Sequence, residues 1–177
     1  MFFTKKAQSL AVLFVLAALP AGAQQTSTNR VATNTAWSTF VDGKPKQCWV
    51  VAAPTQSENT RGGKAVSVSR GEIRLFVTYR QGTKGEVSFA GGYPFAPSST
   101  VVLDVGGAKF SLYPDSSAKD WAWSGSADDD AKIVAALKGG SNATLTAKSA
   151  KGTQTVDTFS LSGFSAAVDE AAKQCAN

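Results

Sequence analysis

Residues 102–112 read VLDVGGAKFSL, two segments of alternating apolar and polar residues with Gly106 and Gly107 between them. An alternation with a period of two places successive side chains on opposite faces of a β-strand. A pair of glycines supplies the positive φ angles that a tight hairpin turn requires. The stretch therefore predicts a β-hairpin that turns at the two glycines.

Short segments rich in β-branched and aromatic residues recur on both sides of this hairpin, separated by clusters of Gly, Pro and Ser. This pattern is typical of an all-β sandwich or barrel. Pro94 and Pro97 cannot donate to a strand ladder, so GGYPFAPSS (91–99) is expected to be a connection. The uneven spacing favours an antiparallel β-sandwich. The expected strands are residues 37–41, 48–53, 64–69, 73–80, 86–90, 100–104, 109–113, 142–149 and 153–160.

Two segments depart from the strand pattern and predict short helices. SADDDAKIVAALKGG (126–140) begins with Asp128, Asp129 and Asp130 and ends in glycine, which suits the helix dipole and its caps. SGFSAAVDEAAKQC (162–175) has apolar residues at roughly helical spacing. A terminal helix of about ten residues is marginal alone, so it needs tertiary contacts or a covalent tie.

The N-terminal 23 residues have the layout of a secretory signal peptide. Lys5 and Lys6 precede an apolar run of 13 residues, and cleavage is expected after Ala23. A helix of that length covers about 20 Å of a hydrocarbon core about 30 Å thick, which is short for an anchor. We therefore expect a periplasmic, surface or secreted protein with no transmembrane segment in the mature chain. Residues 24–35 are polar and predict a flexible leader before a single domain at 36–177.

The chain has two cysteines, Cys48 and Cys175. In an exported chain with an even cysteine count, a disulfide is favoured over a reactive thiol. The bridge would join the terminal helix to the strand that begins at Cys48. The loop between them is 127 residues long, and the chain-entropy model assigns such a loop about 5 kcal/mol of stabilisation as an upper figure.

Composition excludes several classes of function. There is no histidine, which removes Ser-His-Asp and Cys-His catalysis, histidine metal sites and histidine pH switches. Loss of the two lysines of the signal peptide lowers the formal charge from +5 to +3. The basic residues form no concentrated block, so no nucleic-acid partner is expected. No cofactor is expected either.

The order of several motifs resembles the invasion-associated locus B (IalB) family. The motifs are CWVVAAP (48–54), RGEIRLFVTYR (70–80), GEVSFAGGYPF (85–95), KFSLYP (109–114), DWAW (120–123), IVAALKGG (133–140) and AKSAKGTQTVDTFSLSGFSAAV (147–168), followed by a final cysteine. The resemblance covers nearly the whole mature chain. Its most specific parts are residues 86–95 and 151–167.

The resemblance implies an immunoglobulin-like β-sandwich in an exported envelope protein of Gram-negative bacteria. It also implies a link to invasion of host cells in some pathogens. It carries no catalytic residues and no cofactor. The leading hypothesis is therefore a non-enzymatic protein that acts by binding an unidentified envelope or host protein or glycan.

Trp121 and Trp123 are the candidate ligand-binding residues. They are two positions apart in DWAW, so on a strand both indoles face the same side. If exposed, they form an aromatic platform for a glycan or small ligand. The alternative is that they fill the core, as large aromatic residues usually do.

Two further patterns are weighed as sites. Ser116 and Lys119 have the S-x-x-K spacing of some serine acyl-transfer enzymes, which would require a helix and the companion motifs S-D-N and K-T-G, absent here. The S-x-x-K spacing keeps a histidine-free hydrolase as a third hypothesis, and the missing companion motifs place it behind the other two. Asp128, Asp129 and Asp130 could hold a hard cation, but a helix N-terminus accounts for them more simply.

Overall fold

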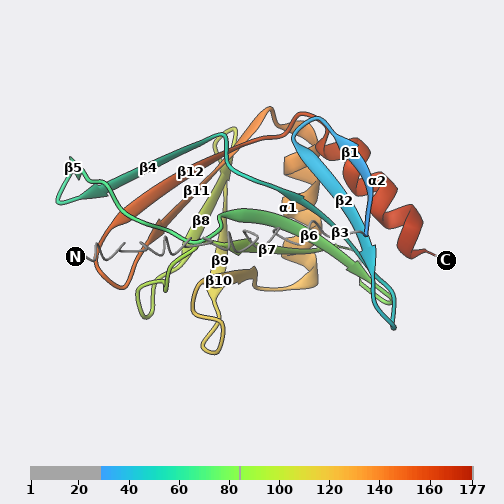
Figure 1. Cartoon of the computed structure of the whole chain (residues 1–177), viewed down its shortest axis with the longest axis horizontal. Coiled ribbons are helices and arrows are strands. Elements are labelled where there is room, and N and C mark those ends of the chain that lie inside the picture. The colour runs from blue at the N-terminus through green and yellow to red at the C-terminus, as the bar shows by residue number, and fades with distance from the viewer. Residues whose placement is uncertain (1–28, 84, 177) are drawn as a thin grey trace, which may run out of the picture.

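A computed structural model describes residues 29–83 and 85–176 of the chain (Figure 1). The expected signal peptide at 1–23 lies outside these residues. The elements in chain order are β1 (Arg30–Asn34), β2 (Trp37–Asp42), β3 (Gln47–Ala52), β4 (Gln56–Arg61), β5 (Lys64–Ala65), β6 (Arg74–Arg80), β7 (Glu86–Ala90), β8 (Val101–Val105), β9 (Ala108–Pro114), β10 (Trp121–Ser124), α1 (Ala127–Gly139), β11 (Asn142–Lys148), β12 (Gln154–Ser160) and α2 (Phe164–Cys175).

The strands form one antiparallel sheet in the order β1-β2-β3-β6-β7-β10-β9-β8-β11-β12-β4-β5. The expected mainly β, antiparallel fold with two short helices is thereby confirmed. We call β1-β2-β3-β6-β7 and β9-β8-β11-β12-β4-β5 the two halves, or layers, of this sheet. They are continuous, because the short strand β10 pairs with β7 on one side and with β9 on the other. In an immunoglobulin-like sandwich the layers are separate sheets, so β10 is the element that joins them here. The hairpin at Gly106 and Gly107 is confirmed as β8 and β9.

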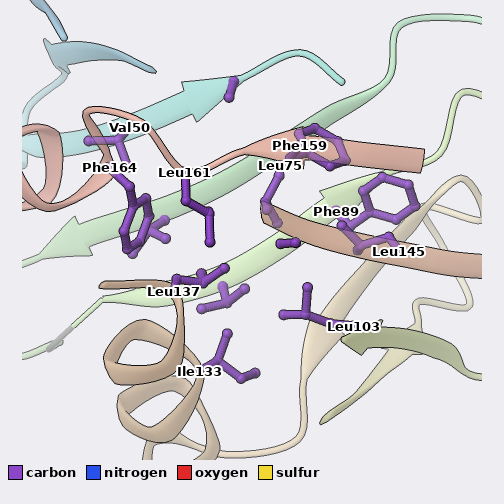
Figure 2. Close-up of a cluster of buried hydrophobic side chains, with 14 of the residues drawn as sticks. Val50, Leu75, Phe89, Leu103, Ile133, Leu137, Leu145, Phe159, Leu161 and Phe164 are labelled. Carbon is purple, nitrogen blue, oxygen red and sulfur yellow. The ribbon is translucent and has the colours of Figure 1, made fainter. Parts of the chain in front are cut away.

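The core lies on one face of this sheet, where its two halves and both helices meet (Figure 2). Phe89 of β7 contacts Phe159 of β12 edge-to-face, with ring centroids 6.3 Å apart. Ile133 of α1 and Phe164 of α2 are fully buried in the same cluster. Burying a side chain of this size stabilises the fold by about 1.5–3 kcal/mol, so this shared core holds the halves together.

The helix α2 packs against β1, β2, β3 and β6, as Figure 1 shows at the C-terminal end. Its buried residues recur at helical spacing: Phe164, Ala167, Val168 and Ala171. The helix begins after Gly163, whose φ is 86°. A Cβ at this position would lie 2.0 Å from the carbonyl oxygen of Asn34. Glycine is therefore required for α2 to approach β1 so closely.

The predicted disulfide joins Cys48 and Cys175, with Cα atoms 5.8 Å apart. Cys48 is fully buried on β3, and Cys175 is the last residue of α2. The covalent tie between the terminal helix and the Cys48 strand is thus confirmed.

The helix at 126–140 is also confirmed as α1. The hydroxyl of Ser126 caps it by accepting a hydrogen bond from the Asp129 backbone N–H, at 3.2 Å. The three acidic residues 128–130 lie in the first turn, where the helix dipole stabilises negative charge. No helix among the described residues is long and apolar enough to cross a membrane.

The expectation of a flexible leader at 24–35 is wrong for its second part. Residues Arg30–Asn34 form β1, which pairs with β2 at the edge of the sheet. The side chains of this strand are exposed or partly exposed. An edge strand is held by its backbone hydrogen bonds, so it needs no apolar alternation and leaves little trace in the sequence.

Candidate binding face

Trp121 and Trp123 lie on β10 with their indoles on the same face of the sheet. Ala122 between them is fully buried on the core face. Both indoles are partly exposed, and their ring centroids are 5.7 Å apart with 22° between the planes. The two tryptophans therefore lie on the outer face and do not fill the core.

Phe76 of β6 extends this stack. Its ring centroid is 5.2 Å from that of Trp121, with 30° between the planes. The strand β7 runs between β6 and β10, and it places the small residues Ser88 and Ala90 beneath the rings. Small side chains on the middle strand let the aromatic rings meet above it. Phe76, Trp121 and Trp123 are called the aromatic face below.

The sequence interpretation missed Phe76, although a signal was present. In RLFVTYR (74–80) the core residues Leu75 and Val77 flank Phe76, so strand alternation turns its ring outward. A large aromatic residue at an outward strand position marks either a contact surface or a second cluster. Its pairing with Trp121 depends on the strand order, which the sequence pattern did not reveal.

Depressions flank the aromatic face at both ends. One of about 280 Å³ lies at Trp121, and one of about 600 Å³ lies at Trp123. A third, of about 610 Å³, also borders Trp123. The polar side chains that line these depressions are Glu72, Arg74 and Asp120 in the first, Tyr113, Asp115, Ser124 and Asp129 in the second, and Thr83, Glu86, Ser124, Ser126, Asp128 and Asp130 in the third.

Acidic groups outnumber basic ones around the aromatic face. Asp115 accepts hydrogen bonds from the hydroxyl and backbone N–H of Ser117 and from the backbone N–H of Ala118. These bonds, led by the Ser117 hydroxyl, hold the pKa of Asp115 below its ordinary value. Its carboxylate is therefore charged at neutral pH, and the surroundings favour a neutral or cationic ligand over an anionic one.

One of these carboxylates has a structural task. Asp130 accepts hydrogen bonds from the Val87 backbone N–H, at 2.8 Å, and from the Ser124 hydroxyl. It thereby joins the first turn of α1 to β7 and β10. The bond to Val87 fixes the start of β7, the strand over which the aromatic rings stack.

Ser116 and Lys119 do not form a catalytic pair. Both are exposed in the bends and turn that connect β9 to β10, and no helix carries them. The S-x-x-K chemistry needs the lysine one helical turn after the serine. In the described part of the chain no three His, Cys, Asp or Glu side chains cluster as metal ligands would.

Comparisons with known proteins agree with this architecture. A family model described as "Invasion associated locus B (IalB) protein" matches residues 35–172. The crystal structure of invasion associated protein B from Bartonella henselae resembles this fold with a TM-score of 0.56. The two chains share 19% sequence identity over 82% of this chain and 98% of that chain, a likeness of fold. No curated protein matches the sequence significantly.

Proposed function

Since the chain belongs to the invasion associated locus B family, we propose that it is an exported envelope protein that acts by binding and not by catalysis. The signal-peptide layout of residues 1–23 and the disulfide both support export. The absence of histidine removes the commonest general base. In the described chain Ser116 and Lys119 lack the helix that acyl transfer would need.

The aromatic face is the proposed contact surface, and its ligand is a carbohydrate. The observation that carries this proposal is the partly exposed stack of Phe76, Trp121 and Trp123. A pyranose ring has an apolar face of C–H groups, which packs against the electron-rich face of an indole. Its hydroxyl groups then hydrogen-bond to polar side chains at the rim.

The charge around the aromatic face selects among carbohydrates. Three carboxylates border the rings, those of Asp115, Asp120 and Glu72. Arg74 forms an ion pair with Glu72 at 3.3 Å. Carboxylates accept hydrogen bonds from sugar hydroxyls but repel sulfate and uronate groups. The proposed ligand is therefore a neutral glycan, carried by the bacterial envelope or by a host cell.

Titration of the protein with neutral disaccharides of glucose or N-acetylglucosamine tests the proposal. We expect quenching of tryptophan fluorescence and a saturable heat of binding. Trp123→Ala should weaken the affinity by roughly two- to tenfold, since one aromatic stacking contact is worth about 0.5–1.5 kcal/mol. Heparin fragments should quench the tryptophan fluorescence far less than the neutral sugars.

Trp49→Ala is the matched control. Trp49 stacks on Phe40 on the same face of the sheet, three strands away from β10. At about 4.8 Å per strand this is about 14 Å, beyond the reach of a disaccharide at Trp123. A neutral sugar that binds Trp123→Ala as well as the unchanged protein contradicts the proposal. So does a large loss of stability in Trp123→Ala, because it would show a mainly structural role.

A further inference from the structure

A fourth recess lies where the two halves of the sheet meet, and it shares only Gly92 with the depression at Trp121. It has a volume of about 610 Å³, within the range of small-molecule sites. Three parts of the chain form its walls: the end of β4 with the segment after β5, the segment after β7, and the turn from β11 to β12. Its lining includes Arg61, Ser69, Tyr93, Pro94, Ser149 and Lys151. This recess is called the Arg61 pocket below.

The walls of the Arg61 pocket are held in place by contacts on both sides. Gly71 donates a backbone hydrogen bond to Gly92 at 2.8 Å, and a Cβ on Gly92 would lie 2.7 Å from the Gly71 oxygen. The Tyr93 hydroxyl hydrogen-bonds to that of Thr155 on β12 at 2.5 Å. The pocket is therefore formed before any ligand arrives, which reduces the entropic cost of binding.

The charged groups of the Arg61 pocket are all basic. Asp157 neutralises Arg70 through two hydrogen bonds, at 2.6 and 2.8 Å. Arg61 donates to the buried hydroxyl of Thr153 at 2.7 Å. Among the described residues no carboxylate pairs with Arg61 or Lys151. Two positive charges are thus left for a ligand.

The bond to Thr153 also orients Arg61. It occupies one N–H group of the guanidinium, and a guanidinium has five. The hydroxyl groups of Ser69 and Ser149 line the same recess. Burial raises the pKa of the Tyr93 phenol, so this group is neutral at physiological pH and adds no negative charge.

The rest of the wall is apolar. Val68, Pro94 and the ring of Tyr93 line the recess beside the basic groups. We propose that the Arg61 pocket binds a small organic anion, in which an oxyanion contacts Arg61 and Lys151 and an apolar portion packs against these three residues. The chemistry shared by the candidate ligands is a carboxylate or a phosphate on a compact apolar group, since both oxyanions accept paired N–H donors. This site is distinct in place and opposite in charge to the aromatic face.

Phenyl phosphate and benzoate are the probes that test this proposal, with benzyl alcohol as the neutral analogue. Each is titrated into the isotope-labelled mature protein while the backbone amide resonances are followed. We expect saturable shifts at Ser69, Gly92, Lys151 and Thr153 with both anions and none with benzyl alcohol. Inorganic phosphate should produce the same shifts with lower affinity, because it lacks the apolar portion.

Variants that remove one positive charge test which residues contribute to the affinity for phenyl phosphate. Arg61→Gln and Lys151→Gln should each weaken phenyl phosphate binding several-fold, and the double variant at least tenfold. Both residues are exposed, so the fold should persist, which the melting temperature verifies. Lys109→Gln removes an equal charge from an exposed site on β9 and should leave the affinity unchanged.

Two outcomes would overturn the proposal. One is the absence of shifts at these four amides at millimolar phenyl phosphate. The other is an equal loss of affinity in Lys109→Gln, which would show general attraction to a positive protein. Trp123→Ala should bind phenyl phosphate normally, so failure at the aromatic face and failure at the Arg61 pocket can be told apart.

Discussion

Tyr79 shows how one buried side chain gives the protein a pH dependence. It lies on β6 beside the disulfide, with 8% of its surface exposed, and its carbonyl oxygen is 3.5 Å from Cys175 Sγ. Burial, assisted by the negative charge of Asp169, raises the pKa of the phenol from 10.0 to about 12. The folded protein therefore keeps this proton under conditions in which the unfolded chain loses it.

Stability should consequently fall between pH 10 and pH 12. Below pH 10 both states hold the phenolic proton and the contribution of Tyr79 is complete. Above that pH the unfolded state ionises first, which favours unfolding by at most about 2–3 kcal/mol. Urea unfolding at pH 8, 10 and 11 should show a smaller loss in Tyr79→Phe than in the unchanged protein. Equal losses in the two proteins would contradict this assignment.

The candidate residues Trp121 and Trp123 show what a residue pattern can and cannot predict. Their spacing predicted a shared face, and the structure places both indoles on one side of β10. Which side faces the core was open, because alanine and tryptophan both suit an apolar interior. The answer depends on Ser88 and Ala90 of β7, which lie beneath the rings. Only the strand order brings these residues together.

At the scale of the element, strands with an apolar face were predictable and polar strands were not. Segments such as Arg74–Arg80 and Asn142–Lys148 alternate buried and partly exposed residues, so their pattern carried the information. The strand Gln56–Arg61 has no buried residue and was missed. It is held by backbone pairing to β12 and β5, which requires no particular side chains.

One expected strand is mostly a connection. Residues 64–69 were predicted to be a strand, but only Lys64–Ala65 pairs, as β5. Residues 66–73 have no regular structure. Arg70 lies within this segment, and its side chain enters the interior and pairs with Asp157. The alternation in the sequence is compatible with a strand and with a connection. The partner of Arg70 in the buried ion pair, Asp157, is 87 residues further along the chain, so the local sequence does not reveal it.

The disulfide should stabilise α2 more than any other element. Cys175 closes the last turn of α2 onto Cys48 of β3, while Phe164 and Val168 dock the first turns. Cys175→Ala should lower the free energy of unfolding by about 2–5 kcal/mol. Because the first turns remain docked, hydrogen exchange should increase most in residues 170–175. Without reductant the folded protein should contain no free thiol.

The same experiment has an internal control. A double replacement, Cys48→Ala with Cys175→Ala, removes the bridge without leaving a buried thiol on β3. It should match Cys175→Ala to within about 1 kcal/mol if the bridge is the main source of the effect. Stability equal to that of the unchanged protein in both variants would mean that packing alone fixes α2.

At the scale of the whole molecule, Arg70 connects the two halves of the sheet through a buried cluster of polar groups. It donates two hydrogen bonds to Asp157 on β12 and two to the carbonyl oxygen of Gly91 after β7. Asp157 accepts a further bond from Ser57 on β4, at 2.7 Å. The guanidinium also lies 4.8 Å from the centroid of the Tyr93 ring. One side chain thus joins the segment before β6, the segment after β7 and β12.

Removal of one member of this ion pair should destabilise the whole fold. The side chains of Arg70 and Asp157 are 6% and 0% exposed, so Asp157→Ala leaves a buried guanidinium without its counter-ion. The expected loss is about 3–5 kcal/mol in urea unfolding. Glu72→Gln breaks the exposed pair with Arg74 and should cost less than about 1 kcal/mol.

The double variant Arg70→Met with Asp157→Leu removes both charges and should recover most of the stability, since a buried pair stabilises little relative to apolar packing. A double variant as unstable as Asp157→Ala would show that the hydrogen bonds to Gly91, and not the charge balance, hold the halves together.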